Sequence, residues 1–217
     1  MENDSIAYAS MLVLTPFDFK ALGIKDGYGI HKVVYGLFED IRSPQEKRSD
    51  FPSGILFTEK EGDIRQKKIL ILSNRKPHLT PQFGKIETKQ VPNSFLNYDR
   101  YGFEVTINPT RRDSKTKKLI PIKKREEVRR WFFERSCESW GFQSSPETME
   151  VGRMGVQIFE KSGERIVHGF AKLKGTFLVT DREKFQRSFL EGIGRGRAFG
   201  FGLLLIAPLG TQQKGGF

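Results

Sequence analysis

Apolar and polar residues follow one another in the first third of the chain as they do in one helix and three strands. The expected order is strand, one-sided helix, strand, strand, at residues 7–14, 27–39, 54–58 and 67–72. Asp26 can cap the helix, and the apolar residues after it recur at the i, i+3, i+4, i+7 spacing of a helix buried on one side. From residue 73 to residue 97 the pattern fades, and we expect a connector with room for a short helix.

The second half repeats this order and completes it. The expected elements are strand, helix, strand, strand, helix and strand, at residues 102–108, 125–140, 155–160, 166–180, 181–192 and 203–207. Thr180 and Glu183 have the spacing of a capping box at the start of the second helix, and residues 161–164 suit a hairpin turn. Residues 110–118 hold five basic side chains and no apolar one, so we expect a loop there.

This order of elements predicts the fold class. Strand, helix, strand, strand, helix, strand is the order of the ferredoxin-like split βαβ unit. The first half shows the same unit with a poorly defined second part, although no strong sequence repeat links the two halves. The sequence therefore predicts an α+β protein of two tandem ferredoxin-like (RRM-like) domains, residues 1–92 and 93–217.

The charge of the chain points to a polyanionic partner. Lysine and arginine number 37 against 26 acidic residues, which gives a formal net charge of +11. A folded protein this basic usually binds nucleic acid, and no basic amphipathic helix stands out that would favour a membrane surface instead. A basic surface that is merely solvated is the alternative that charge alone leaves open.

Metal and disulfide chemistry find little support in the sequence. Cys137 is the single cysteine, and the three histidines, His31, His78 and His168, lie far apart along the chain. They offer no ligand spacing for zinc, and no group of carboxylates has the spacing of a magnesium site. No apolar run reaches 18 residues, and the N-terminus lacks a basic segment followed by an apolar stretch. We expect a cytoplasmic protein with no metal, no small-molecule cofactor and no membrane contact.

The first helix carries a group of side chains suited to moving protons. Successive residues of a helix lie 100° apart, which puts Tyr28, Lys32 and Tyr35 on the outer face and His31 where that face meets the apolar one. Histidine exchanges a proton near neutral pH, and tyrosine and lysine supply hydrogen bonds and positive charge. RNA cleavage requires that the 2′-OH lose a proton, that the leaving 5′-oxygen gain one, and that the negative charge on the phosphate be neutralised. The alternative is an ordinary boundary histidine beside solvated tyrosines.

Glycines and arginines alternate in the segment 192–202, "GIGRGRAFGFG". Glycines let backbone amides approach a phosphate closely, and Arg195 and Arg197 add charge and bidentate geometry. A dinucleotide-binding loop is excluded by context, because such loops follow a strand and open a helix, whereas this one follows a helix and enters a strand. The alternative is a helix C-cap with close helix–sheet packing. We expect Phe199 and Phe201 in the core rather than as platforms for bases.

Several segments together resemble the CasE family of CRISPR RNA-processing endoribonucleases, which are subunits of the Cascade surveillance complex. The specific part is "GIGRGRAFGFGLLLIAPL" after "GTFLVTDREKFQRSFLEG". The segments "DGYGIHKVVYGLF", "KKILILSNRKP" and "YGFEVTINPTRRD" corroborate it by order and spacing, so that the likeness covers most of the chain. The resemblance implies two ferredoxin-like domains, binding of a CRISPR repeat hairpin, a cut at the base of its stem, and retention of the product among other Cascade subunits.

The resemblance also assigns roles to residues by their positions. It implies that His31 is the catalytic histidine and Tyr28 its partner. Lys32 is given only as possible catalytic support, because family members vary at the position after the histidine. The RNA-binding residues that it implies are arginines and one lysine from three segments: Arg111, Arg112, Lys161, Arg165, Arg195 and Arg197. The loop 42–52 is of a kind that differs between members, and we assign it no role.

The sequence therefore predicts a metal-independent endoribonuclease in which the ribose 2′-OH attacks the neighbouring phosphate. Such a reaction leaves a 2′,3′-cyclic phosphate and a 5′-OH, and its nucleophile is already held beside the bond that breaks. One alternative is a non-catalytic subunit of a ribonucleoprotein that only holds a hairpin RNA, which would not need the pair Tyr28 and His31. Another is a basic structural or ribosome-associated protein, which would explain the charge but not the glycine-rich segment.

Overall fold

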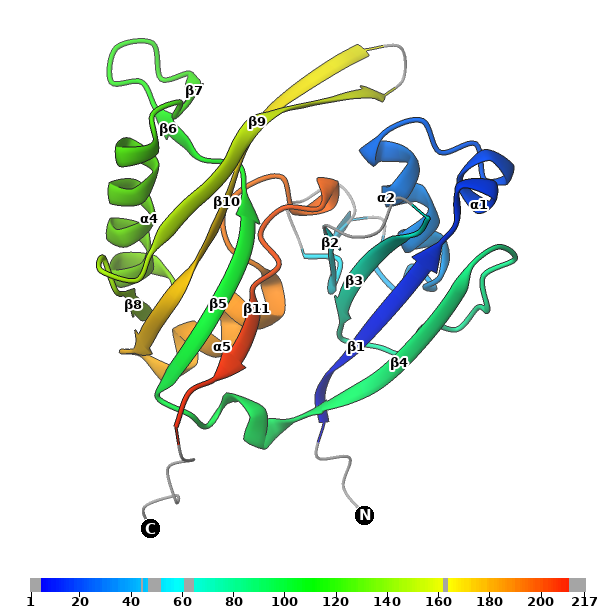
Figure 1. Ribbon diagram of the computed structural model, residues 1–217, viewed down its shortest axis with the longest axis horizontal. Helices are drawn as coiled ribbons and strands as arrows, with labels where there is room; N and C mark the ends of the chain where they lie inside the picture. The colour runs from blue at the N-terminus through cyan, green and yellow to red at the C-terminus, as the bar shows by residue number, and fades with distance from the viewer. Residues whose placement is uncertain (1–4, 44, 47–51, 61–64, 162–163, 211–217) are drawn as a thin grey trace.

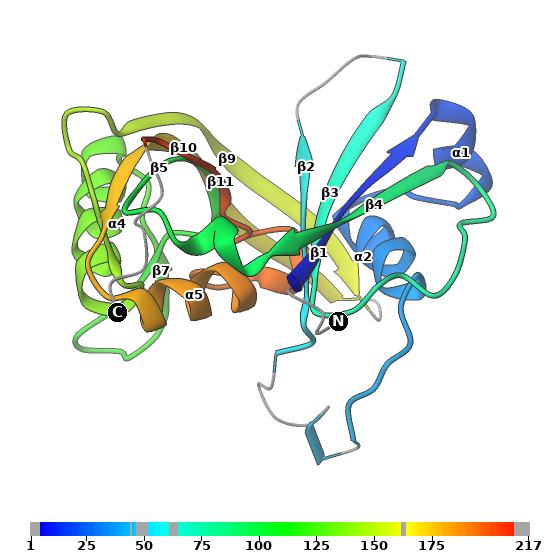
Figure 2. The same ribbon diagram turned by 90° about the horizontal axis from the view of Figure 1, so that it is seen from below.

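The computed structural model describes residues 5–43, 45–46, 52–60, 65–161 and 164–210, without the side chains at positions 160, 161 and 164. The described residues form two large antiparallel sheets that stand side by side, each with helices packed against it, and one separate two-stranded sheet (Figures 1 and 2). This arrangement confirms the predicted α+β class. Among the described residues, no helix is both long enough and apolar enough to span a membrane.

The first half contributes one four-stranded sheet. Its elements are β1 (Ser5–Leu14), α1 (Pro16–Ala21), α2 (Gly27–Gly36), β2 (Ile55–Lys60), β3 (Lys67–Ser73) and β4 (Lys85–Pro92). The strand order β2-β3-β1-β4 is that of the ferredoxin-like unit, with no helix between β3 and β4, where every residue is described. Helix α2 packs on this sheet because Ile30 and Val34 are buried in one cluster with Leu12 and Ile69.

The second half contributes a five-stranded sheet with the complete unit. Its elements are η1 (Asn93–Leu96), β5 (Arg100–Ile107), β6 (Thr110–Arg112), β7 (Leu119–Pro121), α4 (Arg125–Ser139), β8 (Phe142–Ser144), β9 (Glu150–Lys161), β10 (Glu164–Val179), α5 (Arg182–Glu191), η2 (Arg197–Phe199) and β11 (Leu205–Pro208). The order is β11-β5-β10-β8, and β9 also pairs with β10. Strands β8 and β9 therefore share one edge of β10 and together fill the second strand position of the unit.

Strands β9 and β10 extend beyond their sheet as a hairpin. Strand β5 pairs with residues 171–178 of β10, so residues 164–170 are paired with β9 alone. The hairpin reaches across to the first half and passes beside α2 (Figure 1). Residues 162 and 163 of the expected hairpin turn lie outside the described residues. The hairpin β9–β10 of the second half thus lies against α2, the helix that carries the candidate catalytic residues.

Strand β4 corrects the expectation of a connector over residues 73–97. Its sequence KIETKQVP is mostly polar, and only Val91 is fully buried. Strand β4 lies at the edge of the sheet and is held by backbone pairing with β1, from Ser5 to Val13. An edge strand with so little apolar surface gives almost no hydrophobic signal. Helix α1 was also not expected, although Thr15 caps it in a reciprocal capping box with Asp18.

Two further expectations for the second half were wrong in detail. The segment 110–118 is not a simple loop, since it contains β6 and the turn of the short antiparallel hairpin β6–β7. Helix α5 is capped by Asp181, whose side chain accepts a hydrogen bond from the backbone N–H of Lys184 at 3.1 Å, and not by Thr180. Aspartate is at least as good a cap as threonine, so the start of the helix moves by one residue.

The two sheets share buried apolar contacts. Ala7, Leu56 and Leu72 of the first sheet lie in one cluster with residues of the second half, among them Phe189 and Leu203. The 3₁₀ turn η1 connects β4 to β5 at the expected division between residues 92 and 93. That division stays a prediction, because the shared cluster means that the two halves are not packed independently.

Candidate functional site

Helix α2 carries the candidate chemical group. Asp26 caps it by accepting a hydrogen bond from the backbone N–H of Gly29 at 3.0 Å. Ile30 and Val34 face the sheet. Residues that flank them on the helix surface therefore lie at the boundary between the sheet and solvent. His31 is half-buried there, as the helical geometry predicts.

Two tyrosines flank His31. Its ring centroid lies 5.6 Å from that of Tyr28, nearly parallel at 10°, and 4.1 Å from that of Tyr35. The Lys32 Nζ lies 4.8 Å from the centroid of the Tyr28 ring, on the exposed side of the group. The structure therefore brings Tyr28, His31 and Lys32 together, as predicted. Tyr35 is anchored by a 2.9 Å hydrogen bond between its Oη and the Oγ of Ser53 on the segment before β2.

The glycine-rich loop, residues 192–202, approaches the same histidine from the second half. Phe199 brings its ring centroid to 6.5 Å from that of His31. Gly202 shows why the loop needs glycine: its φ is +81°, and a Cβ there would lie 2.2 Å from the carbonyl oxygen of Ile193. Phe201 is buried as expected, but Phe199 is only partly buried and faces the candidate group. Phe199 packs against the buried cluster of Phe159, Phe170 and Phe201, so the expectation that both rings belong to the core is confirmed only in part for Phe199.

The hairpin β9–β10 closes the third side of the group. A Cβ on Gly27, at the start of α2, would lie 2.5 Å from the Phe159 ring, so the hairpin touches the helix where glycine leaves room. Phe159 shares a buried cluster with Phe170 and Phe201, and Tyr28 packs against that cluster. This contact could not be predicted from the sequence, because the two segments are more than 120 residues apart.

A second histidine lies behind Phe199. The His168 and Phe199 ring centroids are 5.1 Å apart, and the His168 Nδ1 is 2.9 Å from the side-chain amide nitrogen of Asn108. Burial lowers the pKa of the His168 imidazole, so the ring is neutral at pH 7. The two histidines are far apart along the chain, whereas in the fold both rings lie close to Phe199. This contact of Asn108 was not predicted; the residue begins the "NPTRRD" segment and forms an isolated β-bridge with Arg195.

The predicted RNA-binding residues fall into separate places. Arg111 and Arg112 are exposed on the hairpin β6–β7, and Arg111 lies 3.9 Å from Glu127. Arg165 is exposed on the hairpin β9–β10, whereas the side chain of Lys161 lies outside the described residues. Arg195 and Arg197 lie on the glycine-rich loop, close in sequence to Phe199.

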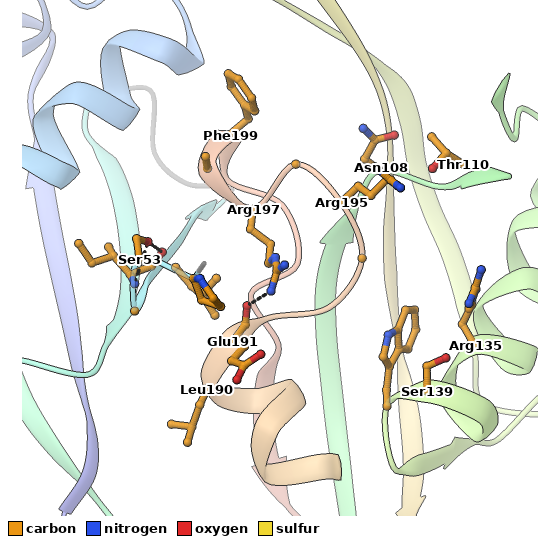
Figure 3. A pocket seen from close by; sticks show the side chains of 18 of the residues that line it. Ser53, Asn108, Thr110, Arg135, Ser139, Leu190, Glu191, Arg195, Arg197 and Phe199 are labelled. Carbon is orange, nitrogen blue, oxygen red and sulfur yellow. Dashed lines mark hydrogen bonds between the residues drawn. The ribbon is translucent and has the colours of Figure 1, made fainter. Parts of the chain in front are cut away.

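Arg195 and Arg197 line a cleft between the two halves (Figure 3). The cleft has a volume of about 820 Å³ and runs between Ser53–Leu56, on and before β2, and the C-terminal part of α4. Arg42 and Arg135 also line it, and neither was assigned a role from the sequence. A signal for Arg135 did exist, because Trp131, Arg135 and Ser139 recur every four residues on one face of α4.

The described residues contain no group of three histidine, cysteine, aspartate or glutamate side chains that could hold a metal ion. The residues around His31 are aromatic and cationic, and the candidate group is therefore built from a proton-exchanging ring, two phenols and an ammonium. This combination can move a proton and stabilise negative charge.

Comparisons with known proteins agree with this geometry. The fold is similar to Thermus thermophilus Cse3 bound to an RNA representing a pre-cleavage complex, at 19% identity and a TM-score of 0.75 over 93% of this chain and 99% of the other. It is similar to the CRISPR-associated protein Cas6e from Escherichia coli K-12, at 21% identity and a TM-score of 0.68 over 93% and 100%. A subunit of a CRISPR RNA-guided surveillance complex matches at 16% identity, with a TM-score of 0.68 and coverage of 93% and 100%.

These likenesses support the predicted pair of ferredoxin-like domains, since the Cse3 and Cas6e structures align over nearly their whole length. A sequence search among curated proteins gives no match. The family model described as CRISPR associated protein matches residues 7–208, which include α2, the hairpin β9–β10 and the glycine-rich loop. The chain therefore belongs to the CRISPR-associated protein family, and its fold is that of the Cse3 and Cas6e members.

Proposed function

We propose that this protein is a metal-independent endoribonuclease that cuts CRISPR precursor RNA at the base of the repeat stem-loop and stays bound to the guide RNA. The observation that carries the proposal is the position of His31, which lies between Tyr28 and Tyr35 where α2 meets the hairpin β9–β10 and the glycine-rich loop. Membership of the CRISPR-associated family supports RNA as the substrate. A protein that only binds RNA has no need of a histidine in this place.

The proposed reaction uses the substrate's own 2′-OH as the nucleophile. The oxygen attacks the adjacent phosphorus, the bond to the 5′-oxygen breaks, and the products carry a 2′,3′-cyclic phosphate and a 5′-OH. His31 takes a proton from the 2′-OH or gives one to the leaving oxygen. Tyr28 and Lys32, which lie beside it, stabilise the charge that develops on the phosphate.

The RNA is held mainly by the second half of the chain. Exposed cations that bind phosphates release counterions and provide affinity without reading the sequence. The proposed contacts are those on the two hairpins and the glycine-rich loop: Arg111, Arg112, Lys161, Arg165, Arg195 and Arg197. Other Cascade subunits are the proposed protein partners, and the cytoplasm is the proposed location, by analogy with the surveillance complex that this fold resembles.

A cleavage assay tests the proposal. A labelled repeat hairpin is incubated with the protein in EDTA, and we expect one cut that leaves a 5′-OH on the downstream fragment and a cyclic phosphate on the upstream one. A hairpin with a single 2′-deoxy sugar before the cut should bind with unchanged affinity and stay intact. Efficient cutting of the deoxy hairpin, or a requirement for added magnesium, would show that water is the nucleophile. Binding without any cut would favour the non-catalytic RNA-binding alternative.

A further inference from the structure

The cleft between the two halves has an excess of positive charge. Four arginines line it, of which Arg42 is paired with Asp40 at 3.1 Å, and Glu191 is the one acidic residue among the described lining residues. The Arg197 guanidinium donates to the backbone carbonyl of Glu191 at 2.8 Å, which leaves its charge uncompensated. In the part of the chain that the structure describes, Arg135 and Arg195 have no carboxylate within 4 Å. A cavity with such an imbalance favours an anionic ligand.

Aromatic side chains alternate with these charges around the cleft. Tyr35 and Phe199 line it on the side of the candidate histidine, and Trp131 and Trp140 line it on the side of α4. The two tryptophan rings are 5.8 Å apart in an edge-to-face arrangement, and Trp131 is partly exposed. Arginines that track a phosphate backbone, together with rings on which bases stack, are the features of sites for single-stranded nucleic acid.

The size of the cleft separates single strands from duplexes. Its volume of about 820 Å³ lies in the range of pockets that enclose one organic ligand, about 300–1,000 Å³. A short run of nucleotides fits such a space, whereas the paired stem of a hairpin does not. The stem must therefore lie against the outer, exposed cations, and only an unpaired part of the RNA can enter between β2 and α4.

The cleft adjoins the candidate chemical group directly. Tyr35 lines the cleft and has its ring centroid 4.1 Å from that of His31, and Phe199 lines the cleft with its centroid 6.5 Å from the same ring. Single-stranded RNA that extends from His31 past Tyr35 and Phe199 therefore enters the cleft directly. Figure 3 shows Arg195 and Arg197 on the loop and Arg135 on α4 around the opening that such a strand would meet.

We propose that this cleft binds the single-stranded RNA segment that adjoins the cleaved phosphate, with Arg135 and Arg195 on its phosphates and Trp131 under a base. The inference rests on the proposed function, since it takes the RNA near His31 to be the substrate. It adds a subsite for the strand that flanks the stem. The cleft then sets how the RNA enters the candidate active site, and α4 becomes part of substrate binding.

The test compares three RNAs: the repeat stem-loop alone, the stem-loop with a 5′ single-stranded extension, and the stem-loop with a 3′ extension. Each carries a 2′-deoxy sugar before the cut, and dissociation constants are measured with the full chain in EDTA over a range of salt. We expect one extension to tighten binding by at least about fivefold, the lower end of what one stacked base contributes. The variant Arg135→Ala should reduce this gain and leave the affinity for the bare stem-loop unchanged.

Arg187→Ala is the matched control, because Arg187 is an exposed helical arginine that does not line the cleft. The variant Arg135→Ala should also lower the salt dependence for the extended RNA by about 0.7 in the log–log slope, the loss of one single-strand phosphate contact. Equal affinities for all three RNAs would overturn the proposal. A loss in Arg135→Ala that is the same for bare and extended RNA would also overturn it, since the cleft would then contact the stem.

The failure of this inference is distinguishable from the failure of the proposed function. The same RNAs without the deoxy sugar are incubated with the wild-type chain, and the products are separated on a gel. If the bare hairpin is cut but the extensions add no affinity, the cleft proposal is wrong and the nuclease stands. If an extension tightens binding but no RNA is cut, the subsite stands and the nuclease is wrong.

Discussion

Helices α2 and α4 hold equivalent positions in two copies of one topology, but they expose different chemistry. Each follows the first strand of its unit and packs on the sheet, α2 through Ile30 and Val34 and α4 through Val128 and Phe132. Helix α2 exposes a histidine between two tyrosines, whereas α4 exposes a tryptophan and an arginine.

Both helices contribute side chains to the cleft, Tyr35 from α2 and Trp131 and Arg135 from α4. The shared topology therefore determines where a helix face points, and the side chains on that face determine what it does. In our proposal the first half supplies the proton transfer and the second half supplies most of the binding. This separation is testable, because changes in one half should alter the rate of cutting and changes in the other should alter the affinity.

The largest effect should come from His31→Ala. We expect cleavage to fall by at least about a hundredfold, because a proton-transfer group is lost, while the affinity for the hairpin stays within about twofold, because affinity depends mainly on phosphate contacts. His78→Ala is the control, since the His78 side chain is exposed and is not among the rings that contact His31. Single-turnover cleavage and binding are measured on the same RNA. Cutting at the wild-type rate would show that His31 takes no part in the reaction, and the proposed division of roles between the two halves would be wrong.

A second test addresses the loop that connects the two halves. In Gly202→Ala the new Cβ would meet the Ile193 carbonyl oxygen at 2.2 Å, whereas Gly194, at φ +72°, has no other atom within 4 Å of the corresponding position. We expect Gly202→Ala to lower the free energy of unfolding by more than about 2 kcal/mol and Gly194→Ala by about 1 kcal/mol, the strain of a left-handed residue alone. Urea denaturation measures both. Equal losses would mean that the backbone at residue 202 relaxes easily.

The third test measures how much the arginines of the second half that lie outside the cleft contribute to RNA binding. The double variant Arg111→Ala with Arg112→Ala should reduce the log–log salt slope of hairpin binding by up to about 1.8, at about 0.9 per phosphate contact. The rate of cutting should not change when the protein concentration is high enough to bind all of the RNA. Lys85→Ala with Lys89→Ala removes the same charge from the exposed edge strand β4 and is the control. Matching losses in both double variants would show that only net charge matters.

The smallest effect concerns pH and His168. Burial lowers its pKa, so the unfolded chain takes up a proton below about pH 6.5 while the folded chain does not. The free energy of unfolding should therefore fall as the pH drops below 6.5, by no more than about 1.4 kcal/mol per pH unit from this residue. His168→Gln should flatten that part of the profile. A steeper profile in His168→Gln would contradict the burial argument.

Much of the arrangement on α2 could be predicted from the sequence, because a helix with one apolar face fixes the direction of every other side chain. Tyr28, His31 and Lys32 lie together as their spacing indicated. The ferredoxin-like order was also predictable, since strong apolar strands and capped helices mark most of the elements. Strand β4 was missed because its polar sequence forms a strand only through pairing with β1.

The surroundings of His31 could not be predicted from local patterns. Phe159 and Phe199 come from two distant segments and reach α2 only when both sheets are packed together. The same applies to His168, whose separation in sequence suggested an unrelated histidine. Arg135 was overlooked because helix α4 is charged on most of its surface, so that the face toward the cleft is not distinguished by polarity.

The pairing of β11 with β5 has a consequence for the order in which the protein is made. Strand β5 ends at Ile107, but its edge partner begins at Leu205, close to the last described residues. The glycine-rich loop lies directly before β11, and its far end is anchored only once that strand has been synthesised and paired. Distant pairings of this kind form late. A ribosome must therefore synthesise every element from β5 to β11 before Phe199 can be fixed beside His31, and the candidate active site is completed later than the sheet of the first half.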